Sequence, residues 1–467
     1  MGVDLLIKNG KVYTEDSGFC MLDVGVTGEK IAFLAEPGAV KDEDAGRVID
    51  ATGKHVLPGI IDWHTHVREP GFEHKEDYLT GTQAAAHGGV TMVCPQPNLD
   101  PAPRTLEAYK LQIDLASEKA VVDFHPIPSP LGFKEGEVEK IADYGAAWFK
   151  IFQKVDKYPY ATAAGTCDTS EILGAFKAVA AADRWCSVHP WDKWFHDAAT
   201  QSVRDEGLPM VTENVRPRWY DNEEMAGAMY QLYYLAKKAG MKWYAMHAWM
   251  PDSIDLVRLA KKEGVIPVVG SFELMPSIDP AEHLYYPEKG EWSKWDISHD
   301  AVPDEDYMWA SVMDGTIDFI GTDHAPHSRK DYEYLLEEKP ADWIPASLGY
   351  PLLDWHGHLL LNKVNKGYLT LEKLVEATSV NGAKIFGFYP NKGSNLPGTD
   401  ADFTIVDMEK EWAINSDHVY TKSGLNSYHG RKIKGQVTHT IVRGSVVMEN
   451  DEVIGKPGFG KFIKPVK

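Results

Sequence analysis

The chain has 467 residues, 43% of them hydrophobic and 25% charged, as expected of a folded globular protein with more than one domain. Its formal net charge of −21 argues against nucleic acid or an anionic membrane as a partner, because both would repel an acidic surface. No signal-peptide pattern and no apolar run near the ~20 residues of a membrane span is present. We expect a cytoplasmic protein that acts on a small molecule.

Short strands are the first predicted elements, between Asp4 and Val56, and the same alternation of apolar and polar residues returns near the other end of the chain. The pair Asn9-Gly10 favours a two-residue hairpin turn, and Arg443-Gly444 is a similar turn signal. We expect the segments 1–57 and 389–467 to build one small β-sandwich together. The Gly-, Pro- and Lys-rich tail is predicted to be a solvated terminus, the alternative being docking on a neighbouring subunit.

The segment 58–388 alternates short apolar runs with stretches of helical spacing, a pattern typical of repeated βα units. Eight such units predict an α/β fold with a (β/α)8 barrel. The predicted strands are GIIDWHTHV, GVTMVCPQP, VVDFHPIP, AAWFKIFQ, WCSVHP, KWYAMHAW, VIPVVGSFE and IDFIGTDHAPH.

Two histidines end the first barrel run. His64 and His66 are two residues apart, so on a strand both imidazoles point to the same face, as a metal ion requires of two ligands from one strand. Taken alone, this H-x-H pair is equally consistent with two structural histidines.

Further candidate ligands stand at the ends of later runs: Lys150, His189, His247 and Asp323. Residues at the carboxyl ends of barrel strands converge on one mouth, so these side chains are expected to meet His64 and His66 there. Imidazole and carboxylate donors suit a divalent metal such as zinc. The four cysteines show no C-x-x-C spacing, so a thiolate zinc site is not indicated.

Lys150 is the unusual member of this set, because a protonated ammonium cannot bind a cation. If burial lowers its pKa, the neutral amine can capture carbon dioxide, and the resulting carbamate can bridge two metal ions. The alternative is an ion pair between Lys150 and Asp323.

With these residues in place, the chain resembles the cyclic amidohydrolase branch of the amidohydrolase superfamily, which comprises dihydroorotases, allantoinases and hydantoinases. The resemblance covers nearly the whole length, and its most specific motifs are HVREPG at 66–71 and TDHAPH at 322–327. It implies a homo-oligomer, a dimer or tetramer, with two divalent metal ions, most simply zinc.

The resemblance also implies a role for each ligand. His64, His66 and Asp323 would hold one metal ion, His189 and His247 the other, and carboxylated Lys150 would bridge both. A hydroxide that bridges the two ions would attack the amide carbonyl. Asp323 would accept its proton as general base and pass it to the departing nitrogen as general acid.

Three residues, Arg68, Asn98 and His327, match positions that bind the substrate carboxylate in dihydroorotases. An arginine fork with two directional donors suits an anionic group beside the scissile ring. For Arg68, an ion pair with Glu69 or Glu73 is the structural alternative.

The chain departs from the family pattern on the substrate side. Tryptophans follow two of the histidines closely, and the segments SFELMPS and ISHDAV replace usual family motifs. Trp191, Trp194 and Trp249 are therefore predicted to wall a larger or more apolar ring, the alternative being ordinary packing under loops.

These features predict a hydrolase that opens a carboxylated or aromatic-substituted cyclic amide, imide or ureide. Hydantoinase or allantoinase activity, hydrolysis of acyclic amides and deamination on the same scaffold are alternatives. A non-catalytic scaffold protein is a further alternative, which the complete set of candidate ligands disfavours.

Overall fold

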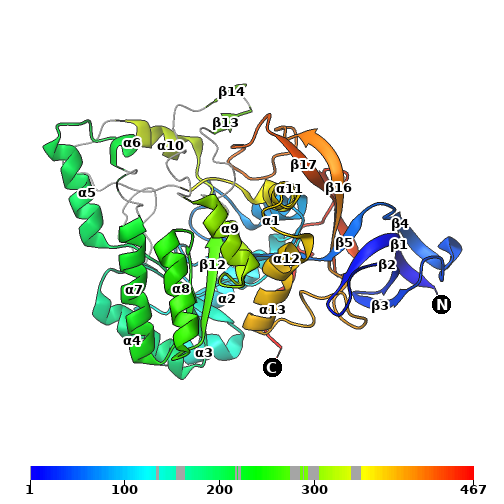
Figure 1. The fold of residues 1–467 in the computed structure, drawn as a ribbon, viewed down its shortest axis with the longest axis horizontal. Helices are drawn as coiled ribbons and strands as arrows, with labels where there is room; N and C mark the ends of the chain where they lie inside the picture. The colour runs from blue at the N-terminus through cyan, green and yellow to red at the C-terminus, as the bar shows by residue number, and fades with distance from the viewer. Residues whose placement is uncertain are drawn as a thin grey trace.

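The computed structural model describes residues 2–132, 136–153, 164–215, 218, 222–273, 284–287, 289–292, 304–337 and 349–466. Two structural units are visible in Figure 1: a sheet of strands from both chain ends on the right, and a barrel with its surrounding helices on the left. Together they account for the (β/α)8 barrel and the terminal β-structure that the sequence predicts.

The two chain ends meet in one nine-stranded sheet. Strand β5 (His55–Pro58) pairs with β16 (Phe403–Ala413) in antiparallel register, which joins the amino-terminal strands to the carboxyl-terminal ones. The other members are β1 (Val3–Thr14), β2 (Gly18–Thr27), β3 (Lys30–Ala35), β4 (Ala45–Asp50), β17 (Lys432–Val442), β18 (Ser445–Glu449) and β19 (Glu452–Val453). Buried apolar residues from both ends, among them Val24, Val56, Phe403 and Ile441, share one core.

The predicted hairpin turn at Asn9-Gly10 is wrong. Strand β1 continues through both residues as a bulge: Asn9 takes a φ of 60°, and the register to β2 shifts between Ile7 and Gly10. The backbone N–H of Asn9 donates to Asp23 at 2.8 Å, so a long-range contact replaces the local turn bond. The chain reverses instead at residues 15–17, whereas Arg443-Gly444 does connect β17 to β18.

Eight parallel strands form the barrel, and each overlaps a run predicted from the sequence. They are β6 (Ile60–Thr65), β7 (Val90–Pro95), β8 (Asp123–Phe124), β9 (Trp148–Phe152), β10 (Trp185–His189), β11 (Lys242–Ala245), β12 (Val268–Glu273) and β15 (Phe319–Gly321). Two junctions close the ring: the N–H of Lys150 donates to Pro128 O at 3.0 Å, and the N–H of Asp323 donates to His64 O at 2.9 Å.

The principal barrel helices lie outside this ring (Figure 1). They are α1 (Tyr78–His87), α2 (Leu106–Lys119), α3 (Glu137–Tyr144), α4 (Thr169–Ala181), α7 (Asn222–Ala239), α8 (Pro251–Glu263), α9 (Glu305–Met313) and α11 (His356–Asn365). Helix α4 shows why they form: the Asp168 side chain caps its first turn, and Ile172, Phe176 and Val179 form the buried apolar stripe.

The remaining elements complete the described part of the chain. They are α5 (Lys193–Asp205), α6 (Thr212–Val215), α10 (Arg329–Leu336), α12 (Leu371–Val375), α13 (Asn381–Phe386), η1 (Asp42–Asp44), η4 (Leu353–Trp355), η5 (Glu376–Val380), β13 (Tyr285–Tyr286) and β14 (Glu291–Trp292).

Large apolar side chains fill the barrel interior below its carboxyl mouth. Trp63, Trp148 and Phe386 belong to one buried cluster, and the rings of Trp148 and Phe386 stack 4.2 Å apart. Gly321 allows β15 to approach β6, because a Cβ at this position would lie 2.8 Å from Cβ of His64. The side chains at the mouth therefore lie above a closely packed apolar barrel interior.

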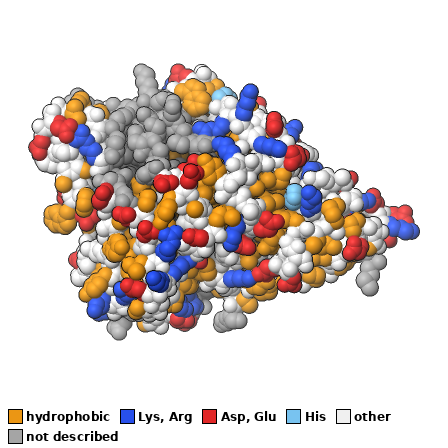
Figure 2. Space-filling model, in the orientation of Figure 1, with side chains coloured by type: hydrophobic (Ala, Val, Ile, Leu, Met, Phe, Trp, Pro, Cys, Tyr) orange, Lys and Arg blue, Asp and Glu red, His pale blue; other side chains and the backbone are white. Residues whose placement is uncertain are grey.

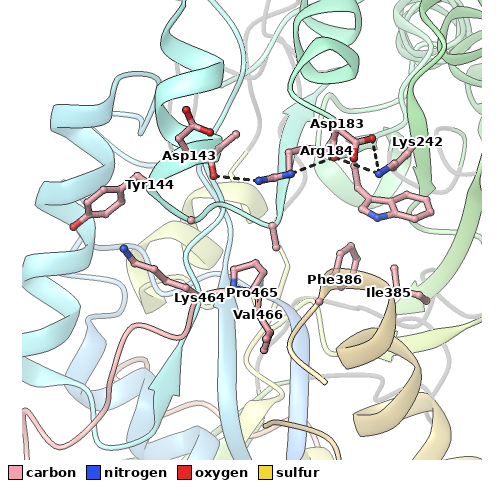
Figure 3. Close-up of a pocket in the computed structure, with 15 residues that line it drawn as sticks. Asp143, Tyr144, Asp183, Arg184, Lys242, Ile385, Phe386, Lys464, Pro465 and Val466 are labelled. Carbon is pink, nitrogen blue, oxygen red and sulfur yellow. Dashed lines mark hydrogen bonds and ion pairs between the residues drawn. The ribbon is translucent and has the colours of Figure 1, made fainter. Parts of the chain in front are cut away.

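The tail differs from the predicted solvated terminus, because it packs on the barrel of its own chain. Lys461 and Ile463 exchange backbone hydrogen bonds with Phe124, each at 3.0 Å, and the ring of Phe462 lies against those of Phe124 and Tyr144. Pro465 and Val466 line a groove of about 530 Å³ beside Phe386 (Figure 3). The tail thus covers the amino end of the barrel, opposite the candidate metal ligands.

One face of the surface carries acidic and basic side chains interspersed (Figure 2). That face shows no broad basic area among its described residues, in keeping with the acidic composition. Within the described ranges, no helix combines the length and the apolar character needed to cross a bilayer.

Candidate metal centre

The predicted ligands from β6 and β15 meet at the barrel mouth. Oδ1 of Asp323 lies 2.9 Å from Nε2 of His66 and 3.3 Å from Nε2 of His64. These three donor atoms lie within 4.8 Å of one another, a spacing that suits one metal ion. Burial opposes ionisation of Asp323, but the contact with His66 and nearby positive charges lower its pKa overall.

A second pair of histidines adjoins the first. Nδ1 of His189, at the end of β10, lies 2.9 Å from Nε2 of His247, which follows β11. The rings of His247 and His64 are 5.3 Å apart, so the two histidine pairs border the same space. The donor set therefore fits two neighbouring divalent ions.

Lys150 is fully buried on β9, below these histidines. Its Nζ contacts the thioether of Met246 and lies 5.0 Å from the ring centroid of Phe152. Burial lowers the pKa of Lys150 to about 8, although the charges of Asp323 and Glu273 oppose the shift. Among the described residues Lys150 and Asp323 form no ion pair, and the Asp323 carboxylate lies against His66 and His64 instead.

Three residues of this region take left-handed backbone conformations. The φ angles are 67° for Arg68, 62° for His247 and 51° for Asp323. Such angles are uncommon for residues other than glycine and persist where the surrounding structure fixes them. Their concentration at one barrel mouth points to a functional site.

Glu273, the last residue of β12, is a member of the centre that the sequence did not reveal to us. Its Oε2 lies 2.6 Å from Nδ1 of His247, and its Oε1 lies 3.3 Å from Nδ1 of His64. The signal was available, because Glu273 ends a predicted strand in the same way as the other ligands do.

Asn98 lies beside His66. Its Oδ1 is 2.6 Å from Nδ1 of His66, and its side chain is almost fully buried. Its Nδ2 has no hydrogen-bond partner among the described residues. Asn98 therefore orients a candidate metal ligand and retains one donor.

Arg68 and His327 contact each other directly, with Nη2 of Arg68 3.1 Å from Nε2 of His327. Lys75, which we did not predict, lies on the other side of this imidazole, with Nζ 3.2 Å from Nδ1. Burial and the charge of Arg68 lower the pKa of Lys75 to about 8, and Asp331, 3.5 Å away, opposes this effect.

The acidic residues next to Arg68 in the sequence have other contacts. Glu69 pairs with Lys119 and accepts from the backbone N–H of Tyr78, while Glu73 accepts from the N–H of Gly71. Arg68 itself contacts His327, another of the residues predicted to bind the substrate, and the carbonyl of Pro326.

The three predicted pocket tryptophans lie in different surroundings. Trp249 is half-buried, and its ring centroid is 4.9 Å from that of His247. Trp191 is buried against His196, at 4.1 Å between centroids, whereas Trp194 on α5 is 77% exposed. ISHDAV at 297–302 and residues 274–277 of SFELMPS lie outside the described residues.

Comparison with known proteins agrees with this geometry. The model of the amidohydrolase family matches residues 55–447. An L-hydantoinase of Paenarthrobacter aurescens is 28% identical over 98% of both chains. A dihydroorotase of Ligilactobacillus salivarius is 32% identical over 96% of this chain and 99% of its own.

A solved structure shows the same architecture across the whole chain. The L-hydantoinase (dihydropyrimidinase) from Arthrobacter aurescens superposes with a TM-score of 0.86, at 25% identity, and the match covers 99% of this chain and 100% of that one. The chain therefore belongs to the amidohydrolase family of metal-dependent hydrolases, in the cyclic-amidohydrolase branch of its dihydroorotase and hydantoinase relatives.

Proposed function

We propose that the protein is a two-metal hydrolase that opens the ring of a cyclic amide, imide or ureide. One observation carries this proposal: at the carboxyl end of a single barrel, the histidine pairs His64 with His66 and His189 with His247 border Asp323 and the buried amine of Lys150. The dihydroorotase and hydantoinase relatives match over nearly their full length, which supports the reaction class.

Each ligand has a proposed place. His64, His66 and Asp323 would hold one ion, His189 and His247 the other, and Lys150, carboxylated by carbon dioxide, would bridge them. Zinc suits this set of imidazole and oxygen donors. Two divalent ions held here would lower the pKa of a bound water and polarise the substrate carbonyl.

Asp323 is the proposed general base and general acid. Its carboxylate lies at hydrogen-bond distance from His66 and borders the space between the histidine pairs, where the attacking water must be placed. It would accept the proton of that water during attack and then donate the proton to the ring nitrogen as the C–N bond breaks.

The surroundings of Arg68 favour a substrate with a carboxylate beside the scissile amide. Arg68, His327 and the Nδ2 donor of Asn98 are the proposed ligands of that carboxylate, and Lys75 adds a second buried basic group behind His327. A hydantoin with an aromatic substituent is the second candidate, because Trp249 lies next to His247 and Trp191 closely follows His189.

We also propose a cytoplasmic location and a homo-oligomer, either a dimer or a tetramer. The location is supported by the four cysteines, all of which are free thiols, as expected in a reducing compartment. The oligomer is proposed from the resemblance to the family.

The test is a ring-opening assay of protein reconstituted with zinc and bicarbonate. Dihydroorotate, 5-substituted hydantoins, dihydrouracil and allantoin are offered separately, and chelator-stripped protein is the control. We expect metal-dependent opening of one of these rings, dihydroorotate first. Metal-loaded protein that opens none of them would contradict the proposal, and release of ammonia would identify a deaminase instead.

A further inference from the structure

One buried carboxylate touches a candidate ligand of each metal ion. Both oxygens of Glu273 are engaged, Oε1 with Nδ1 of His64 at 3.3 Å and Oε2 with Nδ1 of His247 at 2.6 Å. All three side chains are at most 1% exposed. We propose that Glu273 is a positioning residue that fixes one histidine in each metal position, so that a single carboxylate serves both ions.

The proton positions follow from the chemistry of the carboxylate. An ionised carboxylate can only accept hydrogen bonds, so His64 and His247 must each carry a proton on Nδ1. Their Nε2 lone pairs then face the site, His64 towards Asp323 and His247 towards His189. This is the tautomer in which Nε2 can bind a metal ion, and it is set by the hydrogen bond at the other ring nitrogen.

The other two histidines do not depend on Glu273 in this way. His66 is oriented by Asn98, whose Oδ1 lies 2.6 Å from its Nδ1. His189 turns its own Nδ1 towards His247. Each proposed ion therefore has one histidine fixed by Glu273 and one that is not.

Glu273 is itself held in place. The hydroxyl of Ser271 donates to its Oε1 at 2.9 Å and lies 3.2 Å from the hydroxyl of Tyr244. Backbone pairing of Glu273 with Gly321 fixes the end of β12 against β15. Because the carboxylate is held in this way, it cannot move towards one histidine without weakening its hydrogen bond to the other.

Asp62 provides a matched control. It is also a fully buried carboxylate, two residues before His64, but it accepts from Thr322 and from the backbone N–H of His64, and it contacts no imidazole nitrogen among the described residues. Substitution of Asp62 therefore alters a buried carboxyl group next to His64 and leaves the contacts of Glu273 with Nδ1 of His64 and Nδ1 of His247 in place.

The experiment measures metal binding rather than turnover. Metal-free wild type, Glu273→Gln, Glu273→Asp and Asp62→Asn are titrated with Zn²⁺ against a chromophoric chelator, and the circular dichroism and Tm of each metal-free form are recorded. The amide of Glu273→Gln can accept from one imidazole but presents N–H groups to the other. The imidazole that faces those N–H groups loses its acceptor, so we expect the affinity for its ion to fall about 10- to 100-fold, the usual effect of losing the partner of a ligating histidine.

Glu273→Asp keeps the inference testable if the glutamine variant misfolds. Aspartate keeps the charge, but its shorter side chain cannot reach Nδ1 of His64 and Nδ1 of His247 at the same time. We expect it to weaken the binding of at least one ion, and Asp62→Asn to bind two ions as the wild type does. Wild-type zinc affinities in both Glu273 variants would overturn the inference. So would a loss of affinity at the same single metal position in both variants, or an equal loss of affinity in Asp62→Asn.

The inference rests on the proposed two-metal function, but the two can fail separately. A wild type that binds fewer than two zinc ions at saturation contradicts the proposed function. A wild type that binds two ions, beside a Glu273→Gln variant that binds two with the same affinity, contradicts only the role of Glu273.

Discussion

Nδ1 of His66 lies 2.6 Å from Oδ1 of Asn98, so the ring nitrogen that faces away from Asp323 donates its proton to the amide oxygen. Nε2 of the same ring faces Asp323 at 2.9 Å. The Nδ2 of Asn98 has no hydrogen-bond partner among the described residues, so it can donate to the proposed substrate carboxylate. Asn98 thereby connects a proposed metal ligand to the proposed carboxylate pocket. Orientation of His66 and binding of the substrate carboxylate are thus two proposed roles of one side chain, and substitution can separate them.

Replacing Asn98 with aspartate keeps the acceptor for His66 but puts a negative charge where Nδ2 was. We expect unchanged zinc content and a KM for dihydroorotate raised roughly 10-fold or more, because a charged hydrogen bond is lost and a repulsion is added. The KM for an uncharged hydantoin should change less. Steady-state kinetics on both substrates measure the contrast, and equal effects on the two KM values would contradict the carboxylate role.

Asp323→Asn is expected to bind zinc nearly as well as the wild type but to lose turnover by at least ~10³-fold, because an amide cannot accept the proton of the attacking water. Metal analysis and kcat are measured on the same preparation. Asn98→Ala, which should weaken substrate binding more than kcat, is the comparison variant. An Asp323→Asn variant with wild-type kcat would rule out the proposed base.

Acid should destabilise the fold through histidines that are buried away from the metal centre. Burial lowers the pKa of His356 and His358 to about 3, and that of His87 and His125 to about 4. Below the unfolded value near 6.5 the unfolded chain binds protons that the folded chain does not. Stability therefore falls as the pH drops from about 6.5 towards 4, by up to about 1.4 kcal/mol per pH unit for each histidine.

His356 allows this dependence to be tested, because neither of its ring nitrogens has a hydrogen-bond partner among the described residues. His356→Phe removes one titrating group without breaking a described hydrogen bond. The plot of Tm against pH between 4.5 and 7 should become shallower, whereas an unchanged slope would show that His356 does not contribute.

The tail should contribute to stability and not to catalysis. Phe462→Ala removes a ring that packs on Phe124 and Tyr144, and we expect it to lower the free energy of unfolding by roughly 1–3 kcal/mol. Val466→Ala, at a residue whose side chain is 48% exposed, should cost much less. Thermal denaturation compares the two, and a larger loss for Val466→Ala would contradict the packing role of the ring.

Most of the fold and the six candidate ligands could be predicted because their signals are local. Apolar runs such as the one before His64 indicate a strand, and the residue at its end is placed at the mouth by the barrel itself. The bulge at Asn9 could not be predicted, because the contact with Asp23 that replaces the turn comes from a neighbouring strand. The docked tail depends likewise on Phe124, hundreds of residues away in the sequence.

The most direct test of the account is the zinc content of wild type and Lys150→Ala, each saturated with zinc in the presence of bicarbonate and then desalted. Lys150 is buried beside the histidine pairs, and without the proposed carbamate the two proposed ions would lose their bridge. We expect two zinc ions per wild-type chain and at most one in Lys150→Ala, with the second ion and part of the activity restored by a short carboxylic acid. Two tightly bound ions in Lys150→Ala without any added acid would contradict the account.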